Sequence, residues 1–165
     1  MASTLILGST DTGGNSYATS NYLWLFPVTA LASLNLNRIR VYAISSGSVK
    51  VGLYQDNSGD PEGQPLLTSN NTGTLVISSQ WNQLVVPSYS LVSSNYYWLA
   101  LIASANCIRL TSVGGSTSCL YSDSQSYASG LPEYCPLDTA EGSYDLRING
   151  WNVDSSGSLL FGGGL

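Results

Sequence analysis

The chain has 165 residues, the size of one ordinary domain, and only 9% of them are charged. Its net charge is −5, and five Lys and Arg residues are too few to neutralise a phosphate backbone, which excludes a nucleic-acid partner. No run of roughly 18 apolar residues occurs, so we expect no membrane span. Ser, Asn, Thr and Gly supply the polarity, which favours an extracellular or surface-displayed location.

Short strand-like runs recur along the chain, separated by clusters of turn residues. Many short strands with closely spaced turns predict an all-β domain, an antiparallel sandwich or barrel. The only candidate for a turn or two of helix is Pro27–Leu36. The predicted strands are Thr4–Leu7, Tyr22–Phe26, Arg38–Ile44, Ser48–Tyr54, Thr74–Ser78, Gln83–Val86, Tyr96–Ala103, Cys107–Thr111, Ser116–Tyr121 and Ser143–Ile148.

Two segments fall outside this strand pattern. The polar stretch Ser122–Asp138 is predicted to be a long loop with a functional or packing role. We expect the sandwich domain to span residues 1–151 and a flexible Gly/Ser-rich tail to span residues 152–165. The tail is either a linker or an apolar strand donated to a neighbouring subunit.

Side chains alternate between the two faces of a strand, which predicts the core positions. Val49, Val51 and Leu53 share one face, as do Tyr97, Leu99 and Leu101 on a later strand. Every Lys and Arg of the predicted strands falls on the opposite face, and several share their strand with an outward aromatic residue. Small residues on this outward face, Gly52 and Ala100, would leave room for a shallow groove.

Aromatic rings stack on the apolar faces of sugars, and Arg and Gln side chains hydrogen-bond hydroxyl groups. The outward residues therefore predict a carbohydrate groove, although outward charge is also how any sheet meets water. The predicted stacking platforms are Tyr42, Tyr54, Trp81 and Trp98, and the predicted polar contacts are Arg40, Gln83 and Arg109.

Three phrases of the sequence resemble a known group of modules. They are Ser48–Leu67, which passes through Gly-Leu-Tyr into an Asp-Pro-Glu-Gly turn, then Gln80–Leu84, and then Asn95–Ala100 with its Tyr-Tyr-Trp-Leu-Ala. Over residues 20–105 the chain resembles jelly-roll β-sandwich modules of microbial cell-surface proteins, phage fibres and polysaccharide-degrading enzymes. The resemblance implies a jelly-roll sandwich shaped like a carbohydrate-binding module. Its motifs are mostly structural, so it bears on fold more than on function.

The chain contains no histidine, which removes Ser-His-Asp triads and His-bearing zinc sites. The carboxylates lie mostly in predicted turns, so we expect no enzyme activity and no cofactor. The sequence from Asp56 to Asp60 places oxygen ligands at alternate positions, as a calcium loop does, but Leu67 stands where an EF-hand has its bidentate Glu. A plain turn is the simpler interpretation, and a structural calcium held by Asp56 and Asp60 is the alternative.

Three cysteines, Cys107, Cys119 and Cys135, allow one disulfide and one free thiol. A Gly114-Gly115 turn would place Cys119 opposite Leu110, so a bond to Cys107 needs another register, and Cys119–Cys135 is equally open.

The sequence therefore predicts a non-catalytic module that binds a polysaccharide. The alternative is a structural or adhesive surface protein, such as a virion fibre, surface-layer or filament subunit. The other partners expected are a larger multi-domain parent protein or further copies of the chain.

Overall fold

The computed structural model describes residues 3–14, 16–69, 72–112, 119–134 and 140–153. These residues form strands and no helix, so none of them belongs to a helix able to cross a membrane. The strands are β1 (Ser3–Gly8), β2 (Ser16–Tyr17), β3 (Leu23–Thr29), β4 (Asn35–Ala43), β5 (Gly47–Asn57), β6 (Asp60–Thr68), β7 (Thr74–Val76), β8 (Gln80–Ser90), β9 (Tyr96–Ala103), β10 (Arg109–Ser112), β11 (Cys119–Ser122), β12 (Ala140–Gly142), β13 (Tyr144–Leu146) and β14 (Ile148–Val153).

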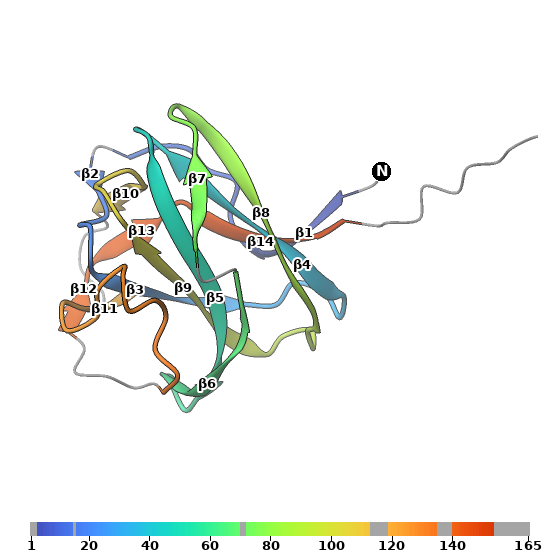
Figure 1. Cartoon of the computed structure of the whole chain (residues 1–165). Coiled ribbons are helices and arrows are strands. Elements are labelled where there is room, and N and C mark those ends of the chain that lie inside the picture. Colours follow the sequence, from blue (N-terminus) through green and yellow to red (C-terminus); the bar gives the residue numbers. More distant parts are fainter. Residues whose placement is uncertain (1–2, 15, 70–71, 113–118, 135–139, 154–165) are drawn as a thin grey trace, which may run out of the picture.

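Two antiparallel sheets pack against each other, which confirms the prediction of an all-β antiparallel sandwich (Figure 1). One sheet has four strands in the order β1-β14-β4-β8. The other has seven, in the order β12-β11-β3-β9-β5-β6, with β7 paired to β5. A three-stranded sheet, β13-β10-β2, adjoins one end of the four-stranded sheet through a bridge between Ala43 and Ile108. The jelly-roll connectivity stays a prediction.

Alternating apolar residues from both sheets fill the space between them, as the strand pattern predicted. From the seven-stranded sheet come Val49, Val51, Leu53, Tyr97, Leu99 and Leu101. From the four-stranded sheet come Ile39, Val41, Ala43, Leu84 and Val86. All of these side chains are buried, so the main core lies on the side of each strand that the sequence indicated.

The outward face of the seven-stranded sheet is covered by the segment from residue 123 to residue 134, which we call the covering segment. Its Tyr127 and Leu131 pack on a second apolar cluster, formed by Leu23, Leu25, Tyr54, Trp98, Ala100, Ile102 and Leu120. Lys50 on the same face is buried and donates a hydrogen bond to the Tyr127 carbonyl oxygen at 2.7 Å. This part of the predicted loop 122–138 therefore packs against the sheet, and residues 135–138 lie outside the described ranges.

The hairpin between β5 and β6 is tighter than the turn expected at residues 56–61. Asn57 pairs with Asp60, and the two residues between them, Ser58 and Gly59, have φ of 58° and 102°. Two left-handed residues in a two-residue loop match the twist of the flanking strands. The strands therefore continue almost to the tip, where the sequence indicated a longer turn.

Other boundaries also differ from the expected ones. Strand β3 runs to Thr29 and β4 begins at Asn35, so Pro27–Leu36 forms no helical turn. In the register of β1 and β14, Ser3 lies opposite Val153. Strand β14 thus includes the first two residues of the predicted tail. Residues 154–165 lie outside the described ranges, so both interpretations of the tail stay predictions.

Candidate functional site

Two of the four predicted platforms are buried, so their expected role on an open surface is wrong. Tyr54 is 0% exposed and Trp98 is 5% exposed. The Tyr54 hydroxyl donates a hydrogen bond to the Pro132 carbonyl oxygen at 2.7 Å, and Trp98 Nε1 donates one to Asp56 Oδ1 at 2.8 Å. Both residues point away from the main core as predicted, but the covering segment packs over this face of the sheet.

The small residues on this face make room for the covering segment. A Cβ atom on Gly52 would lie 2.6 Å from Leu131 Cδ1, closer than any ordinary contact. Ala100 belongs to the same apolar cluster that Leu131 packs against. The space that the sequence assigned to a ligand groove is therefore occupied by the protein itself.

The other five predicted site residues come together on the outward face of the four-stranded sheet and its margin. On β4 and β8, Tyr42 lies opposite Trp81 and Arg40 lies opposite Gln83. Opposed residues of an antiparallel pair share one face and touch each other. The rings of Tyr42 and Trp81 meet edge to face, with centroids 5.7 Å apart. Arg40 donates to Gln83 Oε1 from Nε at 3.0 Å and from Nη2 at 2.8 Å.

Arg109 extends this arrangement from the three-stranded sheet. Its guanidinium carbon lies 5.2 Å from the centre of the Tyr42 ring, and its Nη1 donates a hydrogen bond to the Thr12 carbonyl oxygen at 3.1 Å. The backbone fixes this position, because Tyr42 N donates to Arg147 O and Arg147 N donates to Arg109 O. The two sheets thereby place Arg109 beside the aromatic pair.

Trp151 on β14 is a residue of this face that sequence reasoning missed. The guanidinium carbon of Arg40 lies 4.2 Å from the centre of its ring. Its Nε1 donates a hydrogen bond to Asn149 Oδ1 at 2.6 Å, which fixes the orientation of the indole. The alternation from Ile148 onward, with Asn149 and Trp151 on the same face, was the signal that could have found it.

We call this surface the aromatic face, and define it by Tyr42, Trp81, Trp151, Arg38, Arg40, Gln83 and Arg109. Arg38 joins it because it lies opposite Trp151 in the register of β14 and β4. Among the described residues, Arg38, Arg40 and Arg109 make no ion pair. The aromatic face therefore combines ring surfaces with unneutralised cations.

Arg147, in contrast, is buried and held by acceptors on several sides. Its Nε donates to Gly13 O at 2.6 Å, and its other nitrogens reach Thr111 Oγ1 at 2.8 Å, Asp145 Oδ2 at 2.6 Å and Asp11 Oδ2 at 2.9 Å. The Gly13 N–H and the Arg147 charge lower the pKa of Asp11. This group holds the loop before β2 against β10 and β13.

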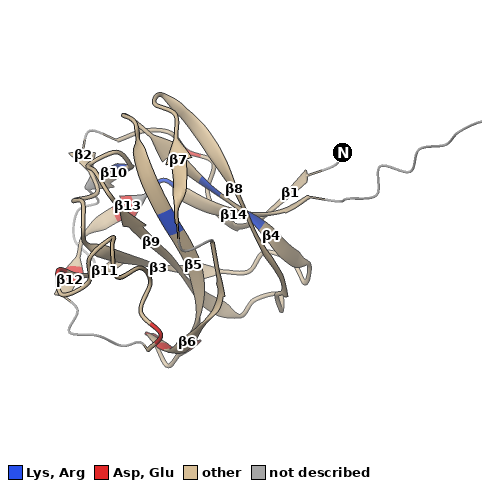
Figure 2. Cartoon of the chain, viewed as in Figure 1, with Lys and Arg blue, Asp and Glu red and all other residues tan. Residues whose placement is uncertain are grey.

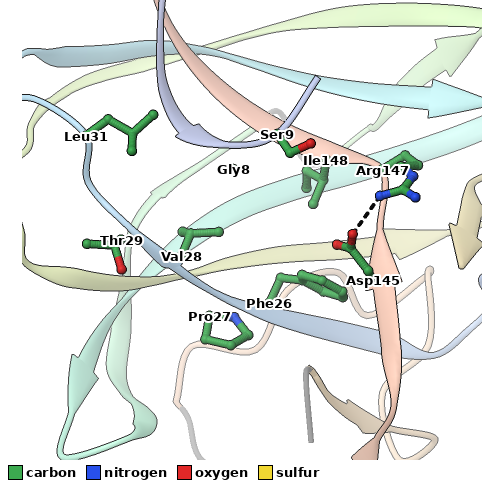
Figure 3. A pocket seen from close by; sticks show the side chains of 10 residues that line it. All are labelled: Gly8, Ser9, Phe26, Pro27, Val28, Thr29, Leu31, Asp145, Arg147 and Ile148. Carbon is green, nitrogen blue, oxygen red and sulfur yellow. Dashed lines mark hydrogen bonds and ion pairs between the residues drawn. The ribbon is translucent and has the colours of Figure 1, made fainter. Parts of the chain in front are cut away.

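A cavity of about 520 Å³ lies beside Arg147, between β3 and the end of β1 (Figure 3). Phe26, Val28 and Ile148 supply apolar walls, and the Asp145–Arg147 pair lies at one end. Because the Arg147 charge is paired with two carboxylates, this cavity offers a ligand no unpaired cation. We assign Arg147 a structural role.

The described residues contain no group of three His, Cys, Asp or Glu side chains able to hold a metal ion. Asp56, a residue of the predicted calcium loop, accepts hydrogen bonds from Trp98 Nε1 and from Gly59 N at 3.3 Å. Asp60 is exposed and closes the hairpin opposite Asn57. Trp98 and the hairpin backbone thus account for the Asp56 carboxylate, and Asp60 belongs to the strand pairing of the hairpin.

The two described cysteines, Cys107 and Cys119, are buried free thiols, so they do not form the disulfide considered between them. Burial raises the pKa of both, which keeps the sulfur atoms protonated and unreactive at neutral pH. Cys135 lies outside the described residues.

Comparisons of the chain with protein-family models, with curated proteins and with solved structures found no match. The function is therefore inferred from the geometry and chemistry of the aromatic face.

Proposed function

We propose that this protein is a non-catalytic module that binds a polysaccharide on its aromatic face, outside the cell or at its surface. The observation that carries the proposal is the convergence of Tyr42, Trp81, Trp151, Arg40 and Gln83 on one sheet face, where each of them is at least partly exposed. Ring faces supply apolar contact for sugar rings, and the Arg and Gln side chains supply hydrogen bonds that orient them.

The dimensions of the face favour an extended ligand. Trp151 lies opposite Arg38, and Trp81 lies opposite Tyr42, so the backbone positions of the two Trp residues stand four residues apart along β4. At roughly 3.3 Å per residue, that is a backbone separation of about 13 Å along the strand. Several consecutive units of an oligosaccharide can extend along a face of this length.

Affinity electrophoresis in gels that contain xylan, mannan, β-glucan or pectin tests the proposal. We expect one of these classes to retard the protein, with an affinity that is micromolar or weaker, because each stacking contact contributes about 1 kcal/mol. Trp81→Ala should then lower the affinity about fivefold while the protein stays folded.

Tyr96→Ala is the matched control for Trp81→Ala. Tyr96 is 61% exposed but lies on β9, outside the aromatic face. Its removal deletes an exposed ring without touching the proposed site, so binding should not change. If Tyr96→Ala and Trp81→Ala weaken binding equally, or if no polysaccharide retards the protein, the proposal is wrong.

A structural or adhesive role is the second candidate, and a different observation favours it. Leu75 on β7 is 71% exposed, Ile77 beside it is 61% exposed, and Val85 on β8 is 68% exposed. Strand β8 is also an edge of its sheet and carries no charged residue. Long uncharged edges with exposed apolar side chains favour pairing with another chain.

Sedimentation velocity distinguishes the two candidates. A protein that assembles through Leu75, Ile77 and the β8 edge should sediment as an oligomer at micromolar concentration. The double variant Leu75→Asp, Ile77→Asp should then return it to a monomer. A monomer at all concentrations, unchanged by the two substitutions, would exclude assembly through β7 and β8.

A further inference from the structure

The four-stranded sheet carries positive charge without any acidic residue. Strands β1, β4, β8 and β14 contain no Asp or Glu, and their only charged residues are Arg38 and Arg40. Figure 2 shows the acidic positions elsewhere, at β6, β12 and β13 among others. A chain of net charge −5 therefore presents one face that is cationic.

The three arginines of this face use few of their donors within the protein. Among the described residues, Arg40 donates to Gln83 alone and Arg109 to the Thr12 carbonyl oxygen alone. Arg38 donates from Nη1 to the Asn37 carbonyl oxygen at 2.7 Å, while its Nε is buried without a hydrogen-bond partner among the described residues. A guanidinium has five N–H donors, so Arg40 and Arg109 each keep donors that no described residue accepts.

Stacking on aromatic rings holds two of these guanidinium groups in place. Arg40 lies over the Trp151 ring and Arg109 lies over the Tyr42 ring. A guanidinium that stacks through its flat side keeps the N–H groups at its edge free for an acceptor. The planar fork of such a group matches the two oxygens of a carboxylate or a sulfate.

The cations are also spread over the face. Arg38 and Arg40 stand two positions apart on β4, a separation of roughly 7 Å, and Arg109 lies beside Tyr42. Cations set among aromatic rings fit a chain that repeats both a sugar ring and a negative charge. A single small anion would occupy only one of the three arginines.

We infer that the polysaccharide recognised by the aromatic face is anionic, with carboxylate or sulfate groups that the arginines bind. This inference rests on the proposed function and narrows its ligand class. The arginines neutralise the charged groups of the polymer, and the rings of Trp81 and Trp151 contact its sugar units.

Paired polymers that differ only in charge test the inference. The first pair is polygalacturonate and its methyl-esterified form, and the second is dextran sulfate and dextran. We expect one anionic member to bind at least about tenfold more tightly than its neutral partner, with an affinity that falls as salt is added. The pair that responds identifies the anion as carboxylate or sulfate.

The neutral and non-sugar polymers separate the two proposals. Equal binding of charged and neutral partners overturns the inference and leaves polysaccharide binding intact. No binding by any of the polymers overturns both. Polyglutamate supplies carboxylates without sugar rings, so binding of polyglutamate as tight as that of the best polysaccharide overturns the inference as well.

Substitutions of the arginines connect the effect to this face. Arg40→Gln should weaken binding of the anionic polymer about fivefold, and a second change, Arg109→Gln, should multiply the loss. Arg40→Lys keeps the charge but loses the planar fork, so its loss should be smaller than that of Arg40→Gln. Circular dichroism checks that each variant folds, and unchanged affinity in the folded double variant overturns the inference.

Discussion

The outward faces of the two sheets carry similar side chains but differ in what lies over them. On the seven-stranded sheet, Tyr54, Trp98 and Lys50 lie beneath the covering segment. On the four-stranded sheet, Trp81 and Arg40 lie on a face that no described segment covers in this way. Lys50 lies 4.5 Å from the centre of the Tyr127 ring, as Arg40 lies 4.2 Å from that of Trp151. The same pairing of cation and ring therefore supports packing on one sheet and remains available to a ligand on the other.

The largest difference between the faces should appear in stability when one Trp is removed from each. Trp98→Ala leaves a cavity under the covering segment and should lower the free energy of unfolding by about 3–5 kcal/mol. Trp81→Ala, which removes a partly exposed ring, should cost about 1 kcal/mol. Chemical denaturation of both variants measures the contrast. Similar losses of unfolding free energy in the two variants would mean that Trp81 is covered as fully as Trp98.

A smaller effect is expected where the covering segment approaches the sheet most closely. The Cβ of Gly52→Ala would meet Leu131 Cδ1 at 2.6 Å and Leu67 O at 2.9 Å. Overpacking of this kind costs about 1–3 kcal/mol, and the strain should loosen the covering segment. Limited proteolysis should then cleave residues 123–134 faster than in the unaltered protein. Val85→Leu, on the open face, is the control and should change neither stability nor cleavage.

Fluorescence quenching should distinguish the indoles of the two faces in variants that circular dichroism shows to be folded. In variants that retain a single Trp, iodide should quench Trp81 and Trp151 and leave Trp98 protected, because Trp98 is buried. On the open face iodide should exceed caesium as a quencher, since the arginines attract the anion. Equal quenching by both ions at Trp151 would contradict the cationic character of the face.

The smallest effect concerns Asp11, in the loop before β2 that borders the aromatic face. The pKa of Asp11 is lowered from its ordinary value of 3.8, so its carboxylate stabilises the folded state above that pH. This contribution is lost as the pH falls through the lowered folded-state pKa. Asp11→Asn should therefore reduce the melting temperature slightly at neutral pH and leave it unchanged in strong acid. A deficit that persists in strong acid would contradict the pairing with Arg147.

Alternation along the strands predicted much of this fold, because a face that packs on another sheet must be apolar. It placed Val51, Leu99 and Leu84 in the main core correctly. It could not reveal that Trp98 is covered, because the covering segment is distant in sequence and packs through Tyr127 and Leu131. An outward ring has the same local pattern whether solvent or another part of the chain lies over it.

One strand, β6, and the extent of another, β14, differ from the prediction. Strand β6 contains Pro61, Gly63 and Pro65, which indicate a turn, yet an edge strand tolerates proline because one side of its backbone needs no partner. Strand β14 runs from Ile148 to Val153, whereas the predicted strand ends at Ile148, so Trp151 is not among the predicted site residues. The candidate site therefore consists of five residues that the sequence predicted and two, Trp151 and Arg38, that it did not.

The pairing of Ser3 with Val153 has a consequence for engineering of the molecule. These residues lie side by side at one corner of the four-stranded sheet, because β1 and β14 are antiparallel neighbours. A short linker between them would close the described body of the chain into a ring, which could be reopened at the Ser58-Gly59 tip of the β5–β6 hairpin. Such a circular permutant would keep every strand pairing of the aromatic face while its new ends emerged from the other sheet.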